Sequence, residues 1–264
     1  TSGEDDVNMS TLAGAYVSVG VNVCLIIDDG KLYSGSGYGD GTIKIWSGST
    51  YSLIKTLTGH PSAVTCLTID DGKLYSGSGF VDNSVKVWNC SDHKLITTLG
   101  RVLRDDGSGE YENVGHANEV ECLTVHGGKL YSGSDDKTIK VWNCSTNELI
   151  TTLTGHTDYV MCLTIHGGKL YSGGWDRTIN VWNCSDDSLI TTLRRHTGSL
   201  RCLRIHDGHL YSGSSDKTIQ VHDCSDDSHI TTLTGHNRPV YDFTFQNGKL
   251  YSKDGSGTIK IWQL

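Results

Sequence analysis

The chain has 264 residues, with 30 acidic and 22 basic side chains, so its formal net charge is −8. That charge argues against a general surface for nucleic acid or for anionic membranes. The sequence contains no run of roughly eighteen apolar residues that could cross a bilayer, and no signal-peptide pattern opens it.

The chain begins with an acidic segment, residues 1–8, which we expect to be a flexible tail. Met9–Gly14 then aligns position by position with Ile230–Gly235 near the other end of the chain. From there a unit built around Gly-Lys-Leu-Tyr-Ser-Gly-Ser occurs six times. Its Leu-Tyr-Ser cores begin at Leu32, Leu74, Leu130, Leu170, Leu210 and Leu250. A period near 40 residues indicates one supersecondary unit that is repeated and packs on its own copies.

The unit that starts at His156 shows how the repeat is built. Residues 160–165 form a β-rich run, and 166–169 turn the chain back into a second strand at 170–172. In other copies this turn reads Asp-Asp-Gly-Lys or Gln-Asn-Gly-Lys, which is typical of a tight hairpin. Residues 178–182 alternate polar and apolar side chains as a third strand, and 189–193 form a fourth. The repeat therefore predicts a four-stranded antiparallel meander.

Two departures interrupt the array. Residues 100–114 add an acidic, Gly- and Ser-containing stretch, which we expect to be a surface loop that either binds a partner or is inert. After Trp262 only two residues follow, so the last unit lacks its fourth strand, and Met9–Gly14 can supply it.

Nine cysteines, an odd number, fall at two repeat positions, and no Cys-x-x-Cys pair occurs. Zinc-knuckle spacing is therefore absent, and we expect small buried free thiols rather than disulfides. Such thiols favour a reducing compartment, so we expect a cytoplasmic protein, with the nucleus as the alternative.

Three further motifs recur in register in the repeat. Gly-His precedes the first strand, Ser-Gly-Ser-x-Asp follows the second, and Thr-Ile-Lys-Val-Trp fills the third. With these motifs the repeat resembles the WD40 family over residues 9–264. The sequence of the repeat is most similar to WD40 domains of ubiquitin-ligase and myosin-heavy-chain-kinase-like proteins. The resemblance implies an all-β fold, a WD40 β-propeller with six four-stranded antiparallel blades closed by the N-terminal strand. A seven-bladed ring with one blade outside this sequence is the alternative.

His, Ser and Asp recur in a pattern that superficially suggests a hydrolase. In the WD40 family the matching positions form a buried hydrogen-bond chain that also includes Trp. Complete sets here are His60, Ser76, Asp82, Trp88; His116, Ser132, Asp136, Trp142; and His156, Ser172, Asp176, Trp182. A catalytic nucleophile would be unique, so we expect structural networks and no enzyme activity. We also expect three incomplete networks. The first blade has Ser34, Asp40 and Trp46 but no matching His, His222 replaces Trp in the fifth blade, and Ser256 replaces Asp in the sixth.

A binding site should come from residues that differ between otherwise similar repeats. Trp175 stands in a turn where other units have small or varied residues, and an exposed Trp favours interaction. By family resemblance, positions flanking the start of each first strand lie on the same ring face. With Trp175, the candidate partner-binding set is Tyr159, Met161, Glu119, Glu121, Asp135, Arg201 and Tyr241. The alternative, that Tyr159 and Met161 merely cover their own blade, stays open.

The sequence thus predicts a non-enzymatic scaffold that binds a protein or peptide segment with an apolar anchor and a Lys or Arg. The cation would face the acidic blade and stack on Trp175. Alternatives are a phosphopeptide-reading adaptor of a ubiquitin ligase, a structural assembly component and a propeller hydrolase or lyase. We expect no cofactor, no metal, no nucleic acid and no membrane partner, and a monomer or one part of a larger multidomain protein or complex.

Overall fold

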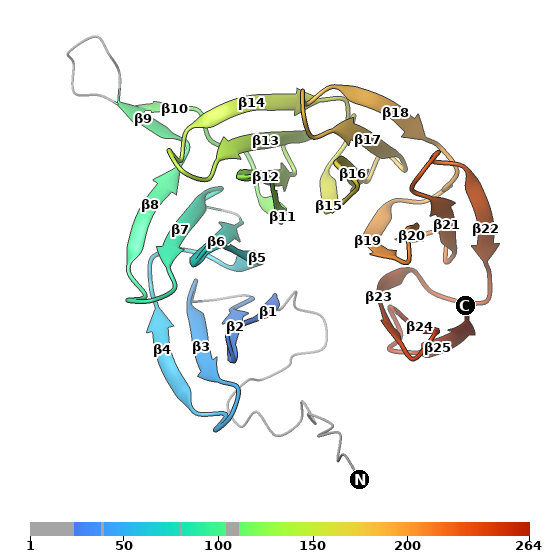
Figure 1. Ribbon diagram of the computed structural model, residues 1–264, viewed down its shortest axis with the longest axis horizontal. Helices are drawn as coiled ribbons and strands as arrows, with labels where there is room; N and C mark the ends of the chain where they lie inside the picture. Colours follow the sequence, from blue (N-terminus) through green and yellow to red (C-terminus); the bar gives the residue numbers. More distant parts are fainter. Residues whose placement is uncertain (1–23, 38–39, 80, 104–110) are drawn as a thin grey trace.

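Figure 1 shows a computed structural model that describes residues 24–37, 40–79, 81–103 and 111–264. In these ranges all regular elements are β-strands, so none of the described residues form a helix that could span a membrane. The strands form six antiparallel sheets, called blades 1 to 6 in chain order, and one short hairpin. Five blades have four strands and blade 6 has three. The predicted all-β propeller architecture is confirmed.

The strands of each blade follow one another in the chain. Blade 1 contains β1 (Leu25–Asp28), β2 (Lys31–Gly35), β3 (Ile43–Ser47) and β4 (Leu53–Leu57). Blade 2 contains β5 (Val64–Asp70), β6 (Lys73–Ser78), β7 (Val85–Asn89) and β8 (Leu95–Leu99). The hairpin is β9 (Arg101–Leu103) with β10 (Tyr111–Asn113). Blade 3 contains β11 (Val120–His126), β12 (Lys129–Ser134), β13 (Thr138–Asn143) and β14 (Leu149–Thr154).

The remaining blades repeat the same order. Blade 4 contains β15 (Val160–His166), β16 (Lys169–Gly174), β17 (Ile179–Asn183) and β18 (Leu189–Leu193). Blade 5 contains β19 (Leu200–His206), β20 (His209–Ser214), β21 (Ile219–Asp223) and β22 (His229–Leu233). Blade 6 contains β23 (Val240–Gln246), β24 (Lys249–Asp254) and β25 (Ile259–Gln263). In Figure 1 the first strand of each blade lies nearest the centre, and the hairpin projects away from the ring.

Tight turns set the register of the first two strands. In blade 1, Asp28 pairs with Lys31 across Asp29 and Gly30, whose φ angles are 44° and 66°. Two consecutive positive φ angles define the two-residue turn that matches the twist of a β-hairpin. Its equivalents, including Asn247–Gly248 in blade 6, have the same sign of φ. The hairpins expected from Asp-Gly and Asn-Gly are therefore present.

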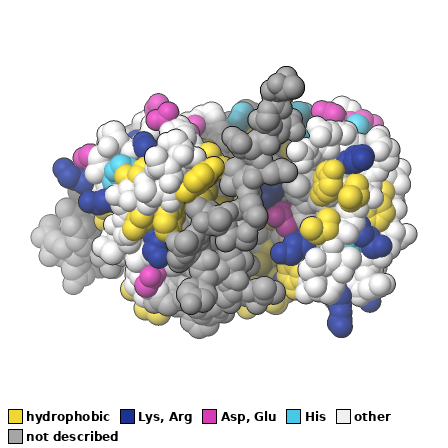
Figure 2. Space-filling model, turned by 90° about the horizontal axis from the view of Figure 1, so that it is seen from below, with side chains coloured by type: hydrophobic (Ala, Val, Ile, Leu, Met, Phe, Trp, Pro, Cys, Tyr) yellow, Lys and Arg dark blue, Asp and Glu magenta, His cyan; other side chains and the backbone are white. Residues whose placement is uncertain are grey.

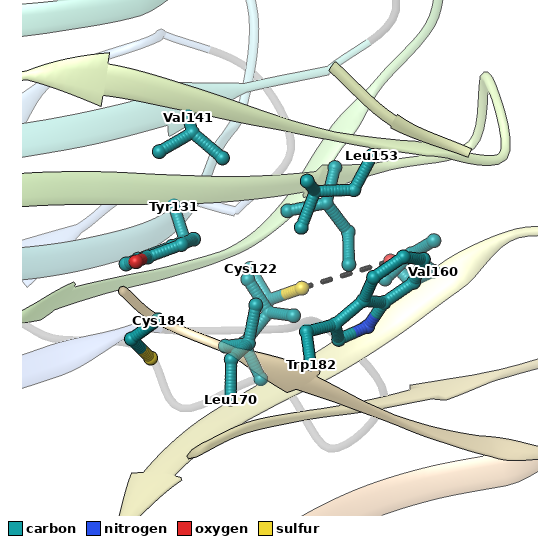
Figure 3. Close-up of a cluster of buried hydrophobic side chains, with 10 residues drawn as sticks. Cys122, Tyr131, Val141, Leu153, Val160, Leu170, Trp182 and Cys184 are labelled. Atoms are coloured by element: carbon teal, nitrogen blue, oxygen red, sulfur yellow. Dashed lines mark hydrogen bonds between the residues drawn. The ribbon is translucent and has the colours of Figure 1, made fainter. Parts of the chain in front are cut away.

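The core lies between neighbouring blades. Tyr131 and Val141 of blade 3 pack against Val160, Leu170 and Trp182 of blade 4 (Figure 3). Between them the Cys122 thiol donates to the Val160 carbonyl at 3.6 Å. Because each blade buries its apolar face on the next one, the array holds together by nearest-neighbour contacts.

The nine cysteines are free. Seven are buried, and Cys24 and Cys90 are partly buried. Burial raises the pKa of the Cys162 thiol to about 12, although the Arg204 charge and the Gly173 backbone oppose it. The thiols therefore behave as small apolar side chains that are poor nucleophiles.

In blade 6, the face that corresponds to the blade 3 face packed on blade 4 is exposed. Ile259 and Ile261 in β25 are 62% and 60% exposed, whereas their counterparts Ile139 and Val141 in β13 are buried against blade 4. Figure 2 views the molecule from below Figure 1 and shows apolar side chains at the surface at left and at right. The expected closing strand, Met9–Gly14, lies outside the described residues, so the six-blade closure stays a prediction.

Candidate functional site

Hydrogen-bond chains link the strands inside the blades. In blade 4, Trp182 Nε1 donates to Ser172 Oγ at 2.9 Å, and this hydroxyl donates to His156 Nε2 at 2.8 Å. His156 Nδ1 then donates to Asp176 at 2.8 Å, and Asp176 also accepts the Thr178 hydroxyl. Burial alone would raise the pKa of Asp176, but the hydrogen bond and charge of His156, together with hydrogen bonds from Thr157 and Thr178, lower that pKa to about 2.

Blades 2 and 3 contain the same Trp-Ser-His-Asp hydrogen-bond chain. In blade 2 it runs from Trp88 through Ser76 and His60 to Asp82. In blade 3 it runs from Trp142 through Ser132 and His116 to Asp136. The three serines have no exposed surface. These groups brace the blades and offer no open nucleophile.

Blade 6 corrects the expectation drawn from Ser256. Its chain is complete, from Trp262 through Ser252 and His236 to Asp254. Asp254 stands two positions before the expected aspartate, and its other oxygen accepts the Ser256 hydroxyl at 2.6 Å. The longer side chain at the end of β24 thus reaches His236 from a position that is serine in blade 5.

In blade 5 the hydrogen-bond chain lacks its Trp end. His196 bonds Ser212 and Asp216, but both ring nitrogens of His222 lack a hydrogen-bond partner. His222 is 2% exposed. Burial, followed by the charges of His229, His196 and Arg195, lowers its pKa to about 4. The imidazole therefore fills the Trp position without reaching Ser212.

A β-bulge displays the variable side chains of the first strands. In β11 the register shifts between Val120 and Cys122, so Glu121 has no paired residue on β12. The same shift occurs in the first strands of blades 2, 4, 5 and 6, at Thr65, Met161, Arg201 and Tyr241. Bulges re-aim side chains. Because it recurs, the bulge brings one non-framework residue per blade to the same end of the inner strands.

Four of the predicted residues form a ladder of stacked groups, called here the aromatic ladder. The ring centroids of Tyr159 and Trp175 are 4.9 Å apart. The Arg201 guanidinium carbon lies 5.2 Å from the Trp175 centroid and 5.4 Å from the Tyr241 centroid. The ladder thus spans blades 4, 5 and 6, and Trp175 remains 36% exposed.

Three other predicted residues form an acidic cluster in blade 3. Oxygens of Glu119, Glu121 and Asp135 lie within 4.8 Å of one another. Burial, together with the charges of Asp135 and Glu119, raises the pKa of Glu121 to about 7. Burial and the charges of Glu119, Asp158 and Asp136 raise the pKa of Asp135 to about 6. Like charges are crowded here without a cation of the described chain to neutralise them.

The eighth predicted residue, Met161, joins these groups only partly. It is half-buried and packs against a hydrophobic cluster that includes Cys162 and Leu200. Sequence reasoning missed Ser215, whose hydroxyl accepts from Arg201 Nε at 2.9 Å. A serine in a variable turn gave no signal for that role.

Two surface cavities lie away from these clusters. One, of about 650 Å³, is lined by residues of blade 2 such as Lys86, by Asn113 in β10 of the hairpin and by residues just before β11. The other, of about 520 Å³, is on blade 1 beside Trp46. Neither contains a residue of the aromatic ladder or the acidic cluster.

Antiparallel blades arranged around a centre, with the Trp-Ser-His-Asp chain repeated in four of them, define a repeat-built β-propeller (Figure 1). The family model for the WD domain, G-beta repeat, matches residues 8–47, 51–89, 109–143, 147–183 and 187–223. These matches cover more than half of the chain, which therefore belongs to the WD40-repeat family. WD40 propellers are typically protein-interaction scaffolds, and the family is generally non-catalytic.

Similar proteins agree with this membership. A segment of 39 residues, 15% of the chain, is 56% identical to zinc finger CCCH domain-containing protein 62 of Arabidopsis thaliana. A match over 38 residues, 14% of the chain, is 55% identical to zinc finger CCCH domain-containing protein 59 of the same organism. These matches span only 9% and 8% of those two proteins. Among solved structures, the computationally designed Ika8 protein is 28% identical with a TM-score of 0.77, over 92% of this chain and 71% of that one.

Proposed function

We propose that this chain is a non-enzymatic scaffold that binds a protein or peptide segment on the face formed by the aromatic ladder and the acidic cluster. The observation that carries the proposal is the convergence of residues that the repeat does not require. Where Trp175 stands, other turns have Val81, Ser215 or Gly255. An exposed aromatic with a charged border has the composition of a binding site.

The energetics of the acidic cluster support the same face. Like charges that raise each other's pKa destabilise the folded protein at neutral pH. Other blades have Thr65, Met161 or Arg201 at the Glu121 position, so the fold does not need a carboxylate there. A partner cation would relieve this repulsion on binding, which favours a Lys or Arg in the bound segment.

The ladder changes the expected role of Trp175. Arg201 already stacks on the Trp175 ring, and Tyr159 packs against the same residue. We therefore assign the partner's cation to the acidic cluster alone, and the partner's apolar side chain to the exposed part of the ladder. Since the buried serines of the His-Ser-Asp chains recur in several blades, they support a non-catalytic role.

A comparative pull-down tests the proposal. Wild type, Trp175→Ala and the double variant Glu119→Lys with Glu121→Lys are used side by side as bait. His166→Ala is the matched control, because His166 is exposed at the other end of β15 in the blade that carries Trp175.

We expect a partner that wild type and the control retain and that both site variants lose. Removing a central aromatic weakens binding by about 2 kcal/mol or more, which suffices for loss in a wash. A partner retained equally by all four proteins, yet lost when residues 100–114 are replaced, would refute the assignment.

A further inference from the structure

Arg201 is held in one orientation by three contacts. It sits at the bulge of β19, between the Trp175 and Tyr241 rings, and its Nε donates to Ser215. A guanidinium stacked in this way keeps its plane and its row of N–H donors fixed. The side chain has therefore lost most of its freedom before any partner arrives.

The terminal amino groups of this guanidinium have no hydrogen-bond acceptor among the residues that the structure describes. Arg204 differs, although it lies three residues further along β19. Its guanidinium pairs with Asp242 at 3.4 Å. Arg201 is thus held by stacking and by Ser215, whereas Arg204 is held by a carboxylate. Guanidinium groups in proteins bind carboxylates and phosphates through two parallel N–H donors.

We propose that Arg201 is the anion-binding pole of the site and takes a side-chain carboxylate of the bound segment. The inference rests on the proposed function and adds a second charge to it. The bound segment then carries a cation for Glu119 and Glu121, an apolar side chain for the ladder, and an Asp or Glu for Arg201. Opposite charges at the two ends also fix the direction in which the segment lies.

The blade order gives the spacing of these charges. The acidic cluster belongs to blade 3, Trp175 to blade 4 and Arg201 to blade 5. Packed sheets lie about 10 Å apart, so the two charged poles are on the order of 20 Å apart. Since an extended chain advances about 3.3 Å per residue, about six residues separate the partner's cation from its carboxylate.

A carboxylate fits this pole better than a phosphate. Phosphopeptide sites use clusters of arginines. The candidate residues offer one stacked Arg, Arg201 in blade 5, and three carboxylates, which form the acidic cluster of blade 3. One carboxylate matches the two parallel donors of one guanidinium, whereas a phosphate dianion calls for more than one cationic side chain.

A peptide array tests the proposal without a known partner. Each peptide is capped at both ends, has about twelve residues, and carries one Lys, a central Leu-Phe pair and one Glu, with the Lys–Glu separation varied. Parallel sets replace Glu by Gln or by phosphoserine. Affinities of the strongest binders are then measured by fluorescence anisotropy for wild type, Arg201→Gln, Arg201→Lys, Trp175→Ala and the control Arg204→Gln.

We expect wild type and Arg204→Gln to prefer separations of about six residues and to lose about tenfold in affinity when Glu becomes Gln. Arg201→Gln should show no such loss, and Arg201→Lys a smaller one, because an ammonium keeps the charge but not the two parallel donors. Unchanged melting temperatures show that the variants are folded. If Arg201→Gln does not fold, the test rests on whether Arg201→Lys shows a smaller loss than wild type when Glu becomes Gln.

Each contrary result has a defined meaning. An equal loss in wild type and in the Arg201 variants overturns the anion pole, and so does Trp175-dependent binding that ignores the Glu. In both cases the proposed function survives. Phosphoserine bound tenfold more tightly than Glu overturns the carboxylate assignment. If no peptide binds wild type more tightly than Trp175→Ala, the proposed function falls, and this inference falls with it.

Discussion

Replacing Glu121 by Gln should stabilise the protein at pH 8 and change little at pH 5. The pKa of Glu121 is raised from 4.5 to about 7 by burial and by its acidic neighbours. The folded state therefore holds a proton between about pH 4.5 and pH 7 that the unfolded state releases. The free energy of unfolding thus falls as pH rises through this window, and the full penalty is present above about pH 7.

The size of the effect follows from that pKa. A tenfold change in proton affinity corresponds to about 1.4 kcal/mol, so a shift from 4.5 to about 7 sets an upper limit of about 3 to 4 kcal/mol. Partial exposure and solvent screening reduce the expected gain to about 1–2 kcal/mol.

Urea unfolding of wild type and Glu121→Gln at pH 5 and pH 8, in low salt, measures this difference. Glu148→Gln is the control, because Glu148 is exposed in the same blade. A variant that is less stable than wild type at pH 8, or a gain of equal size at both pH values, would refute the reasoning.

Other predictions follow from the blades. His222→Trp should stabilise blade 5 by about 1 kcal/mol, seen as a higher melting temperature, because the indole can donate to Ser212. Wild-type stability should fall as pH drops from about 6.5 towards 4, because His222 binds a proton in the unfolded state but not in the folded state. The variant should not show this fall. Asp136→Ala and Asp254→Ala should both destabilise more than Ser256→Ala in urea, and equal small effects would contradict the networks. Removal of residues 1–14 should expose the edge of β25 and promote association in ultracentrifugation, whereas a stable monomer would contradict the latch.

Sequence periodicity predicted most of the fold because each blade uses the same few signals. The Asp-Gly and Asn-Gly turns fix the hairpins, and the repeated Leu-Tyr-Ser marks the second strands. Asp254 shows the limit of alignment by position. Its carboxylate reaches His236 from another backbone site, and a residue-by-residue comparison assigns the role to Ser256 instead.

The candidate site could be predicted only in part for a related reason. Variation between repeats selected Trp175, Arg201 and the acidic residues, and the structure brings them into two clusters on one face. Their mutual contacts depend on side-chain direction at a β-bulge, which the sequence pattern does not encode. Sequence reasoning therefore paired Trp175 with a partner's cation, whereas Arg201 of the same chain stacks on it.

Hydrogen exchange of the chain with and without its retained partner tests the central claim most directly. We predict that binding protects amides at the starts of β11, β15 and β19 and in the turn around Trp175. The hairpin turns at 127–128 and 167–168, at the other end of the same blades, should exchange as before. Protection confined to those turns or to β9 and β10, with no change around Trp175, would contradict the account.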